Sequence, residues 1–124
     1  MENKQCFIKN QDVDFRTWQT ADLQLQLIED EEIAEDILEN VKNVMVSFEQ
    51  NGIEIDKDLS SGDISLDIEK SIIYLHLSQE ETGSFVAGQY VKCQVNILYN
   101  DERRTPTCQA LLMVGDNIYN EEMS

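Results

Sequence analysis

The sequence predicts an all-β protein: an immunoglobulin-like antiparallel β-sandwich of about seven strands with one short helical turn. Three observations support this fold. Apolar residues alternate with polar ones over several short segments, which is the period of a strand with one buried face. Turn residues such as Asn51-Gly52 separate those segments. The length of 124 residues suits one domain, residues 1–124, with a single core. A small β-barrel is the alternative fold.

Residues 1–20 are expected to form an N-terminal arm or strand, with a short apolar stretch at Cys6–Ile8. Phe15 and Trp18 stand among polar residues, and we expect them to anchor this arm rather than to bind a ligand from an exposed position. The first clear strand follows, and its buried face is made by Leu23, Leu25 and Leu27.

An acidic segment, Glu29–Glu39, comes next and contains seven acids and no base. Two structures fit it. One is an amphipathic helix, whose apolar face would be made by Ile33, Ile37, Val41 and Val44. The other is a solvated connection with at most one helical turn near Asp36–Asn40. We favour the connection, because the residues up to Phe48 already alternate as a strand.

The carboxylates of the acidic segment are candidate contact residues that face either a partner or solvent. They are Glu29, Asp30, Glu31, Glu32, Glu35, Asp36 and Glu39. Their spacing lacks the alternating Asp or Asn ligands and the central Gly of a calcium loop. A cation site is therefore not expected here.

Further strands are predicted on both sides of Asn51-Gly52, because both residues tolerate positive φ and close tight hairpins. The turn Ser60-Ser61-Gly62 separates the returning strand from the next two. The apolar positions of those two strands are Ile64, Leu66 and Ile68, then Ile73, Leu75 and Leu77.

A capped turn is predicted before the longest alternating strand. Ser78 and Glu81 have the spacing of a capping box, in which each side chain bonds the backbone amide of the other. Gly83 would let the chain leave the turn, Phe85 would fill its open end, and Gly88 would reset the backbone. Tyr90 follows, in a position similar to the tyrosine corner of immunoglobulin domains. The predicted structural residues are Ser78, Glu81, Gly83, Phe85, Gly88 and Tyr90.

The last hairpin is predicted with a four-residue loop, Asp101–Arg104, because that length aligns the buried faces of its two strands. This register places Cys93 opposite Leu112 and keeps Cys93 about 13 Å from Cys108, too far for a disulfide. We expect all three cysteines, Cys6 included, to stay reduced. Pro106 indicates an edge position, and residues 117–124 form a polar tail.

The formal charge of −16, from nine basic and 25 acidic residues, argues against direct contacts to nucleic-acid phosphates and to anionic membranes. It favours solubility and a basic protein partner. The single histidine, His76, has no identifiable partner for acid–base catalysis, and the cysteines lack the paired spacing of a zinc site. We therefore expect no enzyme activity, no cofactor and no metal.

Hydropathy bears on the compartment. The chain has no run of about 18 apolar residues that would span a membrane. Its N-terminal sequence, MENKQCFIKN, has no apolar signal core. Synthesis in a cytoplasm is the expectation.

Residues 44–114 resemble a group of small structural proteins of tailed bacteriophages that infect Gram-positive bacteria. The matching stretches are VMVSFEQNGIEIDK (Val44–Lys57) and LHLSQEETGSFVAGQYVKCQVNILYNDERRT (Leu75–Thr105). In that group a strand ending in Asn-Gly precedes a turn that reads Leu, Ser or Thr, Gln, two acids and Thr. A Gly and an alternating Val/Gln/Ile strand follow, as here in Leu77–Ile97. The acidic segment and the Gly-less Asp101–Arg104 turn depart from the pattern.

The resemblance implies a non-enzymatic virion component of the tail or baseplate region. Such a protein is made in the host cytoplasm and assembles in several copies with other virion proteins. The acidic composition leaves a second possibility open. The chain would then be a phage-encoded inhibitor or DNA mimic, whose carboxylates imitate phosphates on a host nucleic-acid enzyme.

Overall fold

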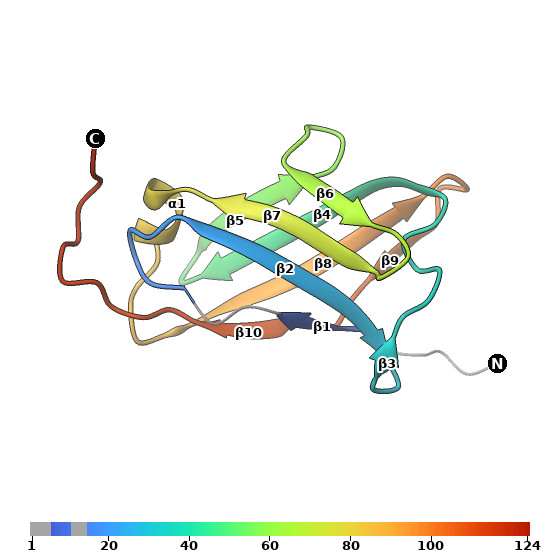
Figure 1. Ribbon diagram of the computed structural model, residues 1–124, viewed down its shortest axis with the longest axis horizontal. Coiled ribbons are helices and arrows are strands. Elements are labelled where there is room, and N and C mark those ends of the chain that lie inside the picture. Colours follow the sequence, from blue (N-terminus) through green and yellow to red (C-terminus); the bar gives the residue numbers. More distant parts are fainter. Residues whose placement is uncertain (1–5, 11–14) are drawn as a thin grey trace.

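The computed structural model describes residues 6–10 and 15–124. It is a sandwich of two antiparallel sheets with one short helix, as Figure 1 shows. The strands are β1 (Cys6–Asn10), β2 (Ala21–Glu29), β3 (Glu32–Ile33), β4 (Val41–Gln50), β5 (Ile53–Asp58), β6 (Ile64–Asp67), β7 (Ile72–Leu77), β8 (Tyr90–Tyr99), β9 (Arg104–Pro106) and β10 (Ala110–Met113), and the helix is α1 (Gln79–Gly83). Residues 1–5 and 11–14 of the predicted N-terminal arm lie outside the described residues. No described helix has the length and apolar character needed to cross a bilayer.

The strand order is that of an immunoglobulin-like sandwich. One sheet has the order β1-β2-β7-β6, and the other has the order β10-β8-β4-β5. In the letters used for immunoglobulin domains, β1, β2, β4, β5, β6, β7, β8 and β10 correspond to A, B, C, C′, D, E, F and G, and the short β3 and β9 have no letter. The two sheets are then A-B-E-D and G-F-C-C′. The two sheets stay separate rather than closing, so the alternative of a barrel is wrong.

The core lies between the sheets and is built by the predicted alternation. Each central strand buries every second side chain, while the residues between them face outward. The fully buried positions include Leu25, Leu27, Val44, Val46, Phe48, Ile73, Leu77, Val91, Val95 and Ile97. The strands predicted at these residues are confirmed.

The predicted register of the last hairpin is wrong. Cys93 lies opposite Ala110, two residues away from the predicted partner Leu112. The loop has three residues rather than four, because the amide of Tyr99 donates to the carbonyl of Arg103 at 2.9 Å. Between Val95 and Cys93, the facing chain advances from Thr107 to Ala110, which is one residue more. This extra residue is a bulge, and bulges shift register without changing the period on either side.

Cys93 and Cys108 form no disulfide, although the predicted register of the hairpin is wrong. Cys93 is buried, Cys108 is half-buried, and both thiols are free. Burial raises the pKa of Cys93 to about 12. Its thiol is therefore protonated and unreactive at neutral pH. The side chain of Cys6 lies outside the described part of the chain.

Candidate functional site

The two groups of residues singled out in the sequence lie at opposite ends of the sandwich. Figure 1 shows α1 at one end and β3, in the middle of the acidic segment, at the other. The acidic end is the candidate contact site, and the α1 end is the predicted structural turn.

The acidic segment is a structured connection without a helix. β2 and β3 form a small hairpin across Asp30 and Glu31, whose φ angles of 52° and 66° are those of a tight two-residue turn. Reverse turns over residues 35–40 lead into β4, with positive φ at Asp36 and Asn40. The favoured connection is confirmed, and the amphipathic helix is wrong.

Two buried side chains and two hydrogen bonds hold this segment to the core. Ala34 and Leu38 are buried, whereas Ile33 of the helical pattern is exposed. The Ser71 hydroxyl donates to the Ala34 carbonyl, and the Tyr99 hydroxyl donates to the Ile37 carbonyl at 2.7 Å. The backbone of the segment is therefore fixed from beneath. Sequence reasoning missed Ala34 and Leu38, because it selected apolar residues at helical spacing, and the segment is not a helix.

The carboxylates of the segment point away from these anchors. Glu29 is half-buried, and the other six acids are exposed. A hollow of about 460 Å³ opens beside them, lined by Asp36, Glu39, Asn40, Tyr99, Asn100, Asp101 and Arg103. The Arg103 guanidinium stacks on the Tyr99 ring at 4.5 Å. Three carboxylates and one guanidinium therefore share this hollow.

The arrangement suits a basic protein surface better than a metal ion. Within residues 6–10 and 15–124, no group of three or more His, Cys, Asp or Glu side chains is placed to hold a metal. Exposed carboxylates attract Lys and Arg side chains over about one screening length, roughly 8 Å at physiological salt. The carboxylates of this end can therefore attract the basic side chains of a partner.

At the other end, the predicted capping box is present. The Glu81 amide donates to Ser78 Oγ at 3.2 Å, and the Ser78 amide donates to Glu81 Oε1 at 2.9 Å. Lys57 adds an ion pair with Glu81 at 2.6 Å. Burial of Glu81 opposes its ionisation, but the hydrogen bonds from Lys57 and Ser78 outweigh this effect and lower its pKa below the usual value of 4.5.

Aromatic packing explains two other residues of the turn. Phe85 is buried, and its ring centroid lies 6.2 Å from that of Phe15. Gly83 does not have positive φ; instead, a Cβ at this position would come within 2.4 Å of the Trp18 ring. Gly83 is thus required for close packing rather than for leaving the turn. Trp18 and Phe15 anchor the chain, as predicted. Gly88 has a φ of 82° and provides the predicted change of backbone direction before β8.

Tyr90 is not a tyrosine corner. Its side chain is 55% exposed, whereas the corner tyrosine is packed and bonded to backbone. Tyr99, at the far end of the same strand, has the bonding of such a residue through its contact with Ile37. The alternation of β8 places Tyr99 on the buried face and Tyr90 on the outer face. It does not reveal the hydrogen bond to Ile37, which is a tertiary contact.

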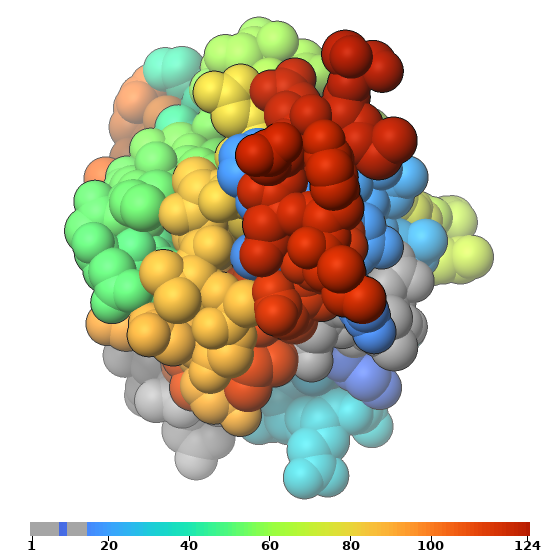
Figure 2. All heavy atoms as spheres, turned by 90° about the vertical axis from the view of Figure 1, so that its left-hand side faces the viewer, coloured from blue at the N-terminus to red at the C-terminus, as the bar shows by residue number. Residues whose placement is uncertain are grey.

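Two further contacts complete the α1 end. Gln50 is buried, and its side chain bonds both the amide and the carbonyl of Val86, at 2.6 and 3.0 Å. The C-terminal tail runs across this end, as Figure 2 shows in red. The Gln79 side chain holds it by bonding both the amide and the carbonyl of Met123.

His76 lies on the surface, as the sequence suggested. Its Nδ1 is 2.7 Å from Asp22 Oδ1 on the neighbouring strand, so the expectation that His76 has no acidic partner is wrong. Both side chains are largely exposed. The pair is a cross-strand surface contact.

Comparisons with known proteins identify the fold and nothing finer. No protein family matches the sequence, and no curated protein matches it. Among solved structures, the chain is similar to part of an endo-beta-1,4-mannanase from Thermotoga petrophila, with a TM-score of 0.54 and 8% identity. The similarity covers 94% of this chain and 21% of that chain, so the chain spans about a fifth of the mannanase. At this identity the likeness shows a shared β-sandwich architecture only.

Proposed function

We propose that this protein is a non-enzymatic structural component of a phage virion, in the tail or baseplate region, which acts by binding other virion proteins. The resemblance to phage structural proteins in residues 44–114 supports this assignment. Those residues form one continuous part of the fold, from β4 through its Asn51-Gly52 turn to α1 and β8.

The observation that carries the proposal is the fixed backbone beneath the acidic segment. Ala34 and Leu38 are buried, and two hydroxyl groups bond the carbonyls of Ala34 and Ile37. These residues close one end of the core, and they also hold the acidic segment in one conformation. A contact surface gains from this fixed conformation, because less conformational entropy is lost on binding.

The DNA-mimic alternative is less well supported by the geometry. A mimic needs carboxylates in a row that follows the regular spacing of phosphates. Here the seven acids of the segment are distributed over a tight hairpin and the reverse turns of residues 35–40, at one end of the molecule. That distribution suits a local contact with basic side chains.

Mass spectrometry of purified virions tests the proposal. We expect this chain in the particle at a fixed multiple of three or six copies, since closed assemblies follow cyclic symmetry. Absence from the particle, together with stoichiometric binding to a host nuclease or polymerase, would establish the inhibitor instead.

A further inference from the structure

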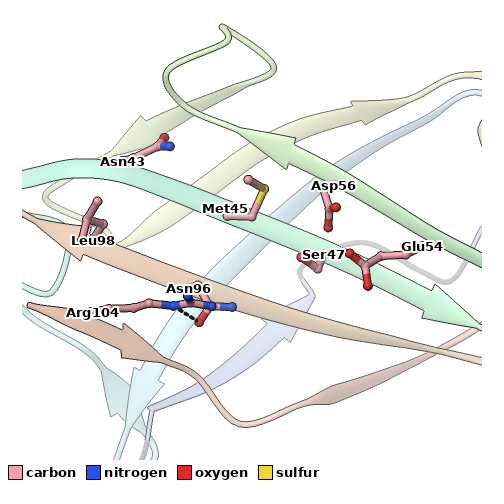
Figure 3. A pocket seen from close by; sticks show the side chains of 8 residues that line it. All are labelled: Asn43, Met45, Ser47, Glu54, Asp56, Asn96, Leu98 and Arg104. Carbon is pink, nitrogen blue, oxygen red and sulfur yellow. Dashed lines mark hydrogen bonds between the residues drawn. The ribbon is translucent and has the colours of Figure 1, made fainter.

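The outer face of the sheet β10-β8-β4-β5 carries a second surface, separate from the acidic end. A depression of about 440 Å³ runs over β9, β8, β4 and β5. Figure 3 shows its lining side chains. Met45 and Leu98 give the floor apolar area, and Ser47 and Asn96 add polar groups to it. The floor residues are half-buried.

Charge is divided between the two walls of this depression. Arg104 on β9 forms one wall, and its Nε donates to Asn96 Oδ1 at 3.1 Å. Glu54 and Asp56 on β5 form the other wall. In the described part of the chain, the ion pairs involve other residues and leave both walls without an opposite charge.

The acidic wall is crowded with like charge. The pKa of Glu54 is raised above its usual value by a hydrogen bond with Asp56 and by the negative charges of Asp56 and Glu49. A cation brought to this wall would relieve that repulsion. The chain itself displays such a cation on the opposite wall, in the exposed guanidinium of Arg104.

We propose that this face binds a second copy of the chain, related by a two-fold axis that lies in the interface and is inclined to the strands. Arg104 is level with Leu98, whereas Asp56 is level with Gln94 and Glu54 with Lys92, so the acids lie further along the strands. A two-fold axis perpendicular to the line from Arg104 to these acids exchanges the two walls. Arg104 of each copy then meets the acidic wall of its partner, twice per dimer.

The dimer should be weak. The face spans four strands at about 4.8 Å spacing and about six residues at 3.4 Å, a plane of roughly 20 by 20 Å. At roughly 400 Å² per copy, this is about half the area that each partner buries in a standard specific interface, so only a transient dimer is expected. The formal charge of −16 on each copy further opposes association. The inference does not depend on the virion assignment, because it concerns the purified chain alone.

Analytical ultracentrifugation of the full chain from about 1 µM to about 1 mM, at physiological salt, tests the proposal. The wild type should pass from monomer to dimer in this range. Arg104→Glu makes both walls acidic, and Glu54→Lys with Asp56→Lys makes both walls basic. Each variant alone should dimerise at least about tenfold more weakly.

The decisive sample is the equimolar mixture of those two variants, because each wall then again faces opposite charge. We expect the mixture to recover dimers, and thermal melts should confirm that each variant is folded. Three results would overturn the proposal: a wild type that stays monomeric, variants that dimerise like the wild type, or a mixture that fails to recover dimers.

Discussion

The two ends of the sandwich use charged side chains in opposite ways. At the α1 end, Glu81 is tied to Ser78 and Lys57, so its charge stabilises the fold. At the acidic end, the backbone is fixed by Leu38 and Tyr99, while most of the carboxylates lie in solvent. Charge is structural at one end and available for binding at the other.

Phe85→Ala should have the largest effect, a loss of roughly 3–5 kcal/mol in the free energy of unfolding. The substitution empties the space beside Phe15 beneath the turn. Denaturant melts measure the loss, and the neighbouring Val86→Ala is the control, because Val86 is 47% exposed. Equal losses in the two variants would refute the role of Phe85 in the core.

Ser78→Ala should cost less, about 1 kcal/mol, because it removes only the side-chain oxygen that caps α1. Ser78→Thr keeps an equivalent oxygen and should cost a fraction of that. If the same melts ranked Ser78→Ala as more damaging than Phe85→Ala, the turn would not be organised as described.

The stability contributed by Glu81 should depend on pH. The pKa of Glu81 is lowered in the folded protein, so its ionised form stabilises the fold above the usual value of 4.5. This contribution is lost as pH falls through the lower, folded value. Glu81→Gln should therefore be less stable than the wild type at neutral pH, and the difference should shrink on acidification. A difference that is constant with pH would contradict the ion pair with Lys57.

Strand positions could be predicted from the sequence, because alternation reports directly which face of a strand is buried. The acidic hairpin could not be predicted, because Asp30 and Glu31 adopt positive φ without the Asn-Gly sequence that is typical of such turns. The last register failed for a related reason. The bulge near Cys108 adds one residue to its strand. The alternation of apolar and polar residues does not show where such a residue is added.

The candidate site was predictable in composition but not in shape. The run of acids is plain in the sequence, whereas its anchoring depends on Ser71 and Tyr99, which are distant along the chain. The requirement for Gly83 also depends on a distant partner, the ring of Trp18. Such tertiary contacts leave no local pattern.

The central claim, that the acidic segment is a contact surface rather than a stabilising element, can be tested by removing charge in two places. The segment variant combines Glu32→Gln, Glu35→Gln and Glu39→Gln. The control combines Glu69→Gln, Glu121→Gln and Glu122→Gln, which removes the same charge from exposed positions elsewhere. Neither should change stability by more than about 0.5 kcal/mol.

Mass spectrometry of virions grown with equal amounts of tagged wild type and tagged variant gives the most direct measurement, since it compares incorporation within one particle. We expect the control variant to enter particles as often as the wild type, and the segment variant to be depleted several-fold. Equal incorporation of the segment variant would contradict the account, because the fixed acidic end would then contribute nothing to assembly.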